Sequence, residues 1–264
     1  MTDLDTALWL VFDTETTGDT PGKDTPVEIG FALTDLTKTL VTGSCLVDPT
    51  PVPVSNVARS IHHIDPATLV GQPNLRAALK MIALKINEAA AGQPVAAYVA
   101  HNAEFDAAML PMLTKLPWLC TYQFSKRLYP TFVKHTNQFL RYELGVEVPE
   151  LGDQPPHRAG ADAIVTAAVL RRMLMAVKFD ARWPNTVEEL LVKISEPILL
   201  TDCTFGKHKG KTWEEIAQTD PGYIEWMLKP KPDKKPLDRD LKFTLEHWSL
   251  PIPTKPDWNP DSGF

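Results

Sequence analysis

The feature that most constrains the fold is an uninterrupted apolar segment at residues 8–12, which leads directly into Asp13 and Glu15 and is closed by Gly18. Five consecutive apolar residues with branched and aromatic side chains are typical of a buried strand. Residues two apart in a strand point to the same side, so the carboxylates of Asp13 and Glu15 can approach one point in space. Neighbouring carboxylates repel each other unless a cation lies between them, so the pattern indicates a hard metal ion. The simpler interpretation is a charged strand end that faces solvent.

The length and the charge set limits on the class of protein. A chain of 264 residues can form one large domain or a domain plus a smaller module. The net charge of −6 argues against a globally basic nucleic-acid-binding protein, although a local basic surface can still hold phosphates. Cys45, Cys120 and Cys203 form no Cys-x-x-Cys pair, so we expect neither a disulfide framework nor a zinc knuckle. The sequence shows no targeting segment and no apolar run long enough to cross a bilayer, so we expect a cytoplasmic protein without membrane association.

Alternating strand and helix patterns in residues 1–178 predict an α/β fold. Besides the first strand, strands are expected at 27–33, 40–47 and 94–100, and the first three form an antiparallel meander. Apolar residues at helical spacing predict an amphipathic crossover helix over 74–91. Further helices are expected at 124–128, 137–144 and 165–177. This order predicts a sheet of mixed strand direction flanked by helices.

Beyond residue 178 the sequence changes in character. Thr186 and Thr212 are each followed three residues later by Glu, the spacing of a capping box, and Asp220-Pro221 is another helix-start signal. A strand is expected at 198–205, followed by a basic turn at 206–211 and a helix through Leu237, Leu241, Leu245 and Trp248. We therefore expect a domain at 1–178, a linker and a small α+β module at 179–250, and a loose proline-rich tail at 251–264.

Four carboxylates lie in three separated segments, each at a strand end or in the first turns of a helix: Asp13, Glu15, Asp106 and Asp162. An α/β sheet assembles its sites at such positions. A set of carboxylates without cysteine favours Mg²⁺ or Mn²⁺ over Zn²⁺. Two such ions, about 3.5–4 Å apart, can hold the attacking and leaving oxygens of a phosphoryl displacement. His157 lies five residues before Asp162 and can take a proton from the attacking water; the alternative is a histidine in a surface loop.

Three segments resemble, in order, the exonuclease motifs of the DEDDh superfamily, whose fold is ribonuclease-H-like: Asp-Thr-Glu-Thr-Thr-Gly at 13–18, His-Asn-Ala-Glu-Phe-Asp at 101–106 and His-Arg-Ala-Gly-Ala-Asp at 157–162. The resemblance implies a 3′→5′ exonuclease that releases nucleoside 5′-monophosphates. It implies that two Mg²⁺ ions, replaceable by Mn²⁺, are bound by Asp13, Glu15, Asp106 and Asp162. It also implies that His157 is the general base, and that His62 in the segment 60–64 contacts the terminal nucleotide.

The likeness is stronger to the exodeoxyribonuclease X subfamily and extends to about residue 250. It rests on Cys120-Thr121, Lys126-Arg127-Leu128, the segment 205–211 and Asp220-Pro221-Gly222-Tyr223 with Trp226. The chain departs from that pattern in a longer loop before Val27 and in its proline-rich tail, which leaves substrate preference and partners open. The catalytic set shows no departure.

Further substrate contacts are candidates with competing interpretations. Lys207, Lys209 and Lys211 in the basic turn can displace counterions from a phosphate backbone, or can simply be solvated at a hairpin tip. Asn102 can donate to a phosphate oxygen or cap a helix. Four aromatic residues can stack bases or form the core of the module: Phe205, Trp213, Tyr223 and Trp226. The remaining candidates are Thr14 and Thr16 in the first motif and, more weakly, Lys126, Arg127, Lys134 and Arg141.

The leading hypothesis from the sequence is a Mg²⁺-dependent 3′→5′ exonuclease acting on single-stranded or duplex DNA ends, with DNA repair as the associated process and a C-terminal module that helps to hold the strand. The nearest competing hypothesis is the same chemistry on RNA or short oligonucleotides. Two further hypotheses are a polymerase-associated proofreading or adaptor subunit and a metal phosphoesterase for small molecules. The sequence names no protein partner.

Overall fold

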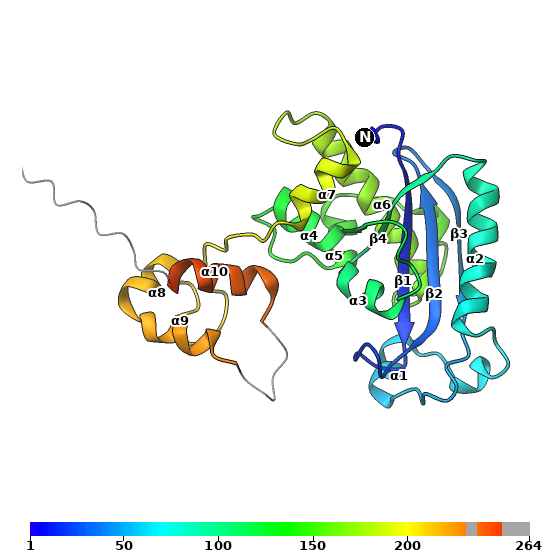
Figure 1. Cartoon of the computed structure of the whole chain (residues 1–264), viewed down its shortest axis with the longest axis horizontal. Coiled ribbons are helices and arrows are strands. Elements are labelled where there is room, and N and C mark those ends of the chain that lie inside the picture. The colour runs from blue at the N-terminus through cyan, green and yellow to red at the C-terminus, as the bar shows by residue number, and fades with distance from the viewer. Residues whose placement is uncertain (231–236, 250–264) are drawn as a thin grey trace, which may run out of the picture. The chain divides into compact units, whose positions relative to one another are not determined.

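The computed structural model describes residues 1–230 and 237–249, which form two compact units (Figure 1). The first unit is Met1–Ser195 and the second begins at Glu196. The first unit extends past residue 178, where the sequence changes in character, because helix α7 (Val187–Ser195) packs Val187, Leu190 and Ile194 into the core of that unit. The expected tail at 251–264 lies outside the described residues.

The first unit is built on a five-stranded sheet with the strand order β3-β2-β1-β4-β5. The strands are β1 (Leu8–Thr16), β2 (Pro26–Thr34), β3 (Thr39–Leu46), β4 (Val95–Ala100) and β5 (Trp118–Cys120). Strands β1, β2 and β3 pair antiparallel, whereas β4 runs parallel to both β1 and β5. The predicted meander and the predicted sheet of mixed direction are confirmed.

Helices cover both faces of this sheet, which explains why β1 is apolar along most of its length. Besides α7, the helices of the unit are α1 (Asn56–His62), α2 (Leu75–Ala90), α3 (Ala103–Met109), α4 (Thr121–Leu128), α5 (Asn137–Glu143) and α6 (Ala159–Lys178). The even-numbered apolar residues of β1 pack with α2, and Trp9 and Val11 pack with α6. Because strand side chains alternate, Asp13 and Glu15 continue the row of Trp9 and Val11 on the α6 side.

A glycine allows α6 to begin very close to the sheet. Gly30 in β2 is the cross-strand partner of Asp13. A Cβ at Gly30 would lie 1.9 Å from the carbonyl oxygen of Ala159, the first residue of α6. Only a residue without a side chain permits this approach. The first turn of α6, which contains Asp162, is therefore held against the strand that bears Asp13 and Glu15.

The second unit is helical and has its own core. Helices α8 (Trp213–Thr219), α9 (Pro221–Leu228) and α10 (Arg239–Ser249) enclose buried side chains that include Cys203, Trp213 and Leu245. The capping box predicted at Thr212 is confirmed, since its hydroxyl accepts from the Glu215 amide and the Glu215 carboxylate accepts from the Thr212 amide. No helix in the described part of the chain combines the length and apolarity that spanning a membrane requires.

The strand predicted at 198–205 is wrong. This segment contains a single β-bridge, between Asp202 and Thr212. Its first amides bond to side chains of α10 instead of a neighbouring strand: Ile198 N–H donates to Asp240 Oδ1 at 3.0 Å, and Leu200 N–H donates to Thr244 Oγ1 at 2.9 Å. The β content of the described second unit is therefore this one bridge, so the expected α+β module is a helical one.

Replacing Gly30 with alanine tests the close contact between β2 and α6. We expect Gly30→Ala to lower the free energy of unfolding by about 3 kcal/mol, the upper part of the range for overpacking, because the clash is with backbone atoms that cannot move aside. Gly43→Ala on β3 is the control, since its Cβ would meet only the ring of Phe31 at 3.2 Å. Urea unfolding measures both variants, and equal losses would contradict the proposed close contact.

Candidate active site

Three of the four predicted metal ligands meet at the end of β1. One carboxylate oxygen from each of Asp13, Glu15 and Asp162 lies within 4.8 Å of the other two. Strand β1 positions Asp13 and Glu15 on the same side, and the first turn of α6 supplies Asp162. The simpler interpretation, a charged strand end in solvent, does not fit, because all three residues are only partly exposed.

Asp106, the fourth predicted ligand, lies in the first turn of α3 and is 3% exposed. Its Oδ1 accepts a hydrogen bond of 2.8 Å from the hydroxyl of Thr14, which ties α3 to β1. Burial raises the pKa of Asp106 to about 7, and the bond from Thr14 opposes this rise. Asp106 is not within the 4.8 Å group, but its charge contributes to the raised pKa values of Asp13 and Glu15.

Burial and mutual repulsion disfavour the charged forms of these carboxylates. Burial is the largest cause of the raised pKa of Asp13, and the charges of Asp106 and Asp162 add to it. Burial also raises the pKa of Glu15 to about 8, and the pKa of Asp162 is raised for the same reason. A divalent cation would remove this repulsion, and a set of oxygen donors only fits Mg²⁺ or Mn²⁺. The residues present therefore fit the expected metal.

Both oxygens of Asp162 are held by neighbouring donors. The backbone N–H of His157 donates to Oδ2 at 2.9 Å, and Gln138 Nε2 in α5 donates to Oδ1 at 3.1 Å. Asn137 Nδ2 supports the same turn by donating to the Asp162 carbonyl at 3.2 Å. Gln138 was not identifiable from the sequence, because no local pattern connects it with a partner 24 residues away.

The backbone amide of His157 contacts the Asp162 carboxylate, and the His157 side chain is exposed. Its φ of 61° is in the left-handed region, which is uncommon for residues other than glycine. The position is a surface loop, as the competing interpretation of this histidine expected, but it lies two residues before the start of α6 and contacts a predicted metal ligand. The imidazole is therefore accessible to water next to Asp162.

An ion pair between a half-exposed arginine and a buried carboxylate anchors the start of α6 to the sheet. Glu28, which is 1% exposed, accepts from Arg158 Nε at 2.9 Å, from Arg158 NH2 at 3.0 Å and from the Ala159 amide at 3.2 Å. Glu28 is the cross-strand partner of Glu15, so the pair lies next to the acidic group. Sequence reasoning missed this pair, although a charged residue inside the apolar strand at 27–33 was a signal.

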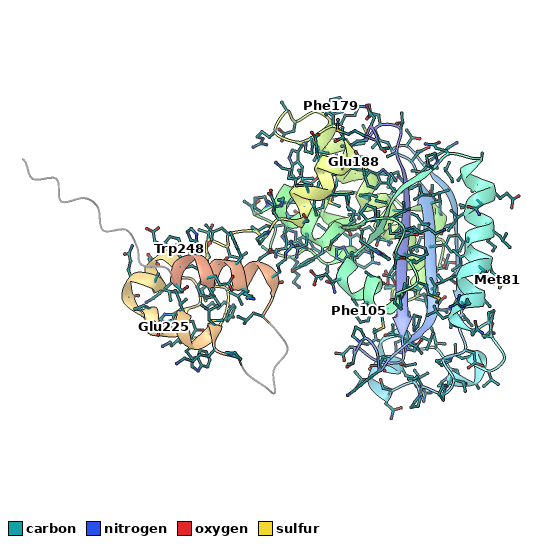
Figure 2. The ribbon with its side chains drawn as sticks, viewed as in Figure 1. Met81, Phe105, Phe179, Glu188, Glu225 and Trp248 are labelled. Atoms are coloured by element: carbon teal, nitrogen blue, oxygen red, sulfur yellow. The ribbon has the colours of Figure 1, made fainter. Side chains whose placement is uncertain are left out.

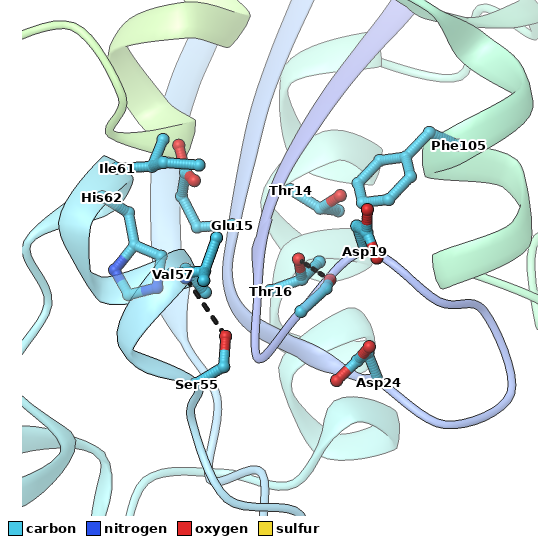
Figure 3. Close-up of a pocket in the computed structure, with 12 residues that line it drawn as sticks. Thr14, Glu15, Thr16, Asp19, Asp24, Ser55, Val57, Ile61, His62 and Phe105 are labelled. Atoms are coloured by element: carbon cyan, nitrogen blue, oxygen red, sulfur yellow. Dashed lines mark hydrogen bonds between the residues drawn. The ribbon is translucent and has the colours of Figure 1, made fainter. Parts of the chain in front are cut away.

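A cavity of about 530 Å³ adjoins Glu15 (Figure 3). Figure 3 shows Val57 and Ile61 beside Glu15 on one side of the view, with Thr14 and Phe105 on the other. The predicted contacts Thr14, Thr16 and His62 all line it. The apolar side chains were not singled out from the sequence, because they come from α1 and α3, which only the fold brings together.

His62 supplies a buried hydrogen-bond donor at this cavity. The residue is 2% exposed, and its Nδ1 accepts from the Ile64 amide at 2.9 Å. The proton of the neutral ring is therefore on Nε2, which makes no hydrogen bond within residues 1–230 and 237–249. Burial lowers the pKa of His62, and the backbone of Thr16 beside the ring opposes this effect.

The other predicted contacts differ in how available they are. The hydroxyl group of Thr14 already donates a hydrogen bond to Asp106, and that of Thr16 donates to the Gly18 carbonyl. A substrate can therefore contact only the other atoms of these two residues. Asn102 occupies the N-cap position of α3, but its side chain makes no capping bond. Lys207, Lys209 and Lys211 lie in the second unit, and Lys207 pairs with Asp220.

A comparison with protein-family models decides the affiliation of the chain. The model described as Exonuclease matches residues 10–170. The chain belongs to the Exonuclease family. The matched residues include the four carboxylates and His157, which are those of the DEDDh motifs. A second model, Exodeoxyribonuclease X-like C-terminal, matches residues 204–230.

Individual relatives support the assignment of the chain to the Exonuclease family. Exodeoxyribonuclease 10 of Escherichia coli K12 is 34% identical over 151 residues, which are 57% of this chain and 64% of the relative, so the match covers less than two thirds of that protein. A DNA polymerase III subunit epsilon-like protein of Rhodobacter capsulatus is 32% identical over 73% of this chain but only 27% of its own length. The solved structure of Exonuclease X in complex with 5′ overhanging duplex DNA is 28% identical, with a TM-score of 0.56 over 71% of this chain and 99% of that one.

Removing Arg158 tests the anchor of α6. Arg158→Leu leaves the buried carboxylate of Glu28 without its partner, and we expect the free energy of unfolding to fall by about 1–3 kcal/mol. The loss is less than for a fully buried pair, because 40% of the Arg158 side chain is exposed to screening water. Arg182→Leu, which breaks a pair in which the arginine side chain is 87% exposed, should change little in the same urea titration. Equal effects of the two substitutions would contradict the anchoring role.

The raised pKa values predict how stability depends on pH in the absence of metal. Glu15 has a usual pKa of 4.5 and a pKa of about 8 in the folded protein, so between these values the folded state binds a proton that the unfolded state has lost. The free energy of unfolding therefore falls as the pH rises through this window. With EDTA present we expect the unfolding midpoint to be a few degrees higher at pH 6 than at pH 8, since 1 kcal/mol corresponds to roughly 2–4 °C.

Two variants identify the source of this pH dependence. Glu15→Gln should lose part of it, whereas Glu104→Gln, which changes an exposed carboxylate of α3, should retain it. Thermal melts at pH 6, 7 and 8 measure the effect. A midpoint that is unchanged or higher at pH 8 would contradict the burial of protonated carboxyl groups.

Proposed function

We propose that the protein is a Mg²⁺-dependent 3′→5′ exodeoxyribonuclease that hydrolyses phosphodiester bonds at DNA 3′ ends and releases nucleoside 5′-monophosphates. The observation that carries this proposal is the convergence of carboxylates from β1, α3 and α6 beside a cavity of about 530 Å³. Such a volume lies within the usual range of small-molecule sites and suits one nucleotide. Membership in the Exonuclease family supports the same reaction.

Asp13, Glu15, Asp106 and Asp162 are the residues that would hold two Mg²⁺ ions, for which Mn²⁺ can substitute. When bound, such ions stabilise the charge that develops on the phosphate during an in-line displacement. The protein orients the ligands in advance, because Thr14 fixes Asp106 while Gln138 and the His157 amide fix Asp162. Fixed ligands reduce the reorganisation that binding would otherwise require.

Other side chains of the site bind the terminal nucleotide and move a proton. Phe105, Val57 and Ile61 provide apolar walls for a nucleoside, and His62 Nε2 donates a hydrogen bond to an oxygen of its sugar or phosphate. An imidazole nitrogen of His157 accepts the proton of the attacking water, which its exposed position next to Asp162 permits. Asn102, at the start of α3, is a further donor to phosphate.

DNA is the proposed substrate because the 28% identical solved structure is described as a complex with DNA and the Escherichia coli relative is named an exodeoxyribonuclease. RNA and short oligonucleotides are the competing substrates. We further propose a cytoplasmic location and a role in DNA repair. The competing function is that of a polymerase-associated proofreading or adaptor subunit. The likeness to the epsilon-like protein supports this alternative, although only 27% of that protein's length is matched.

An end-labelled nuclease assay tests the proposed function. With single-stranded DNA, duplex DNA and matched RNA, we expect Mg²⁺-dependent shortening from the 3′ end of DNA that EDTA stops. Asp106→Asn should abolish it, and His157→Ala should slow it by about 10²–10⁴-fold, the usual contribution of a general base. Glu104→Gln, on the same helix as Asp106, is the control and should retain activity. Activity that survives EDTA or Asp106→Asn unchanged would overturn the proposal.

A further inference from the structure

The aromatic residues of the second unit divide into two classes. Trp213 is 1% exposed and belongs to the core of the unit. In contrast, Phe205 is 40% exposed and Trp226 is 52% exposed, while Tyr223 is partly buried and packs against the core. The core interpretation of these aromatic residues therefore holds for Trp213, whereas large apolar side chains left in contact with water at Phe205 and Trp226 need another explanation.

Two aromatic rings of α9 lie next to each other. Tyr223 and Trp226 are stacked in α9, with ring centroids 5.7 Å apart and planes 25° from parallel. Gly206, the residue after Phe205, has a φ of +65°, and a Cβ there would lie 2.9 Å from the Tyr223 hydroxyl. The basic turn is thus pressed directly against Tyr223. Phe205 directly precedes this contact in the chain, and its ring lies 6.1 Å from that of Trp213, centroid to centroid.

Ion pairs hold the basic turn in this position. Asp220, at the start of α9, accepts from Lys207 Nζ at 2.7 Å and contacts His208 Nε2 at 2.9 Å. Lys207 Nζ also lies 5.0 Å from the centroid of the Tyr223 ring. The ammonium group of Lys207 is therefore engaged in the contacts that hold the turn in place. Lys209 and Lys211 are exposed and form no ion pair with any described residue, so they are the cations available to a ligand.

The turn that carries Lys209 and Lys211 contacts Tyr223 through Gly206 and Lys207, and this combination of aromatic rings with lysines suits one class of ligand in particular. Aromatic rings stack with bases of any sequence, and lysines at the same surface neutralise the phosphates between them. The charges of Lys209 and Lys211 disfavour cationic ligands. We propose that the second unit binds single-stranded DNA through a stacking face formed by Phe205, Tyr223 and Trp226 with Lys209 and Lys211. The inference rests on the proposed function, since the bound strand would be the one whose 3′ end is hydrolysed.

The aromatic part of the stacking face is tested by DNA binding without hydrolysis. The full-length protein is titrated into a fluorescein-labelled dT20 strand in EDTA, and anisotropy is recorded. We expect Phe205→Ala and Trp226→Ala each to weaken binding about 10-fold, the usual effect of losing one stacking ring. The control is Phe179→Ala, which removes a ring that is 79% exposed in the first unit (Figure 2) and should leave the affinity unchanged.

The lysines are tested by the salt dependence of the same binding. Lys209→Gln/Lys211→Gln should reduce the slope of log affinity against log salt by about 1.4, because each phosphate contact on a single strand contributes about 0.7. Lys80→Gln/Lys85→Gln on α2 removes two exposed charges from the first unit and should preserve the slope. Because the four lysines are exposed, neither double variant is expected to affect folding, which circular dichroism verifies.

An abasic strand of equal length separates stacking from phosphate contact with the unaltered protein. We expect it to bind at least about 10-fold more weakly than dT20, since it retains the phosphates and lacks the bases. Equal binding of the two strands, or unchanged binding by both Phe205→Ala and Trp226→Ala, would overturn the stacking face and would point to another partner for this surface. All of these titrations omit metal, so a failed nuclease assay would not alter their result.

Discussion

The structure depends on one electrostatic constraint, which is that several carboxylates are held close together where water is scarce. Oxygens of Asp13, Glu15 and Asp162 lie within 4.8 Å of one another, and Asp106 adds a further charge. Left alone, such groups would move apart or remain protonated, as their raised pKa values indicate. The surrounding fold must therefore oppose the repulsion until a cation relieves it.

Three features of the first unit provide this opposition. Gly30 lets the start of α6 approach β2 at a distance that any side chain would forbid. The pair between Glu28 and Arg158 fixes the same helix end with two charge-assisted hydrogen bonds. On the other side, Gln138 and the His157 amide hold the two oxygens of Asp162. Each feature acts on the first turn of α6, so the position of that turn determines whether the acidic group forms.

The sequence predicted those features of the fold and the site that depend on neighbouring residues in the chain. The apolar run before Asp13 predicted a strand covered on both faces, and the two-residue period predicted that Asp13 and Glu15 share a side, which is the side of α6. The resemblance of motifs supplied Asp106 and Asp162, which periodicity alone could not connect. Contacts between distant residues were harder to predict: Gln138 has no local signal, and the charge of Glu28 within an apolar strand did not identify Arg158 as its partner. Residues 198–205 do not form a strand, and the side chains of Asp240 and Thr244 accept from the amides of Ile198 and Leu200. The packing of α7 on the first unit was missed for the same reason.

The central claim is that this acidic group binds divalent cations through ligands from separate elements, and calorimetric titration with Mn²⁺ in the absence of DNA tests it most directly. We predict saturable binding at pH 8 that Asp162→Asn weakens at least about 10-fold, since the loss of one carboxylate ligand removes both a donor and a charge. Asp153→Asn, which changes an exposed carboxylate in the loop before His157, should bind as the unaltered protein does. Unchanged Mn²⁺ affinity in Asp162→Asn, or no saturable binding by the unaltered protein, would contradict the account.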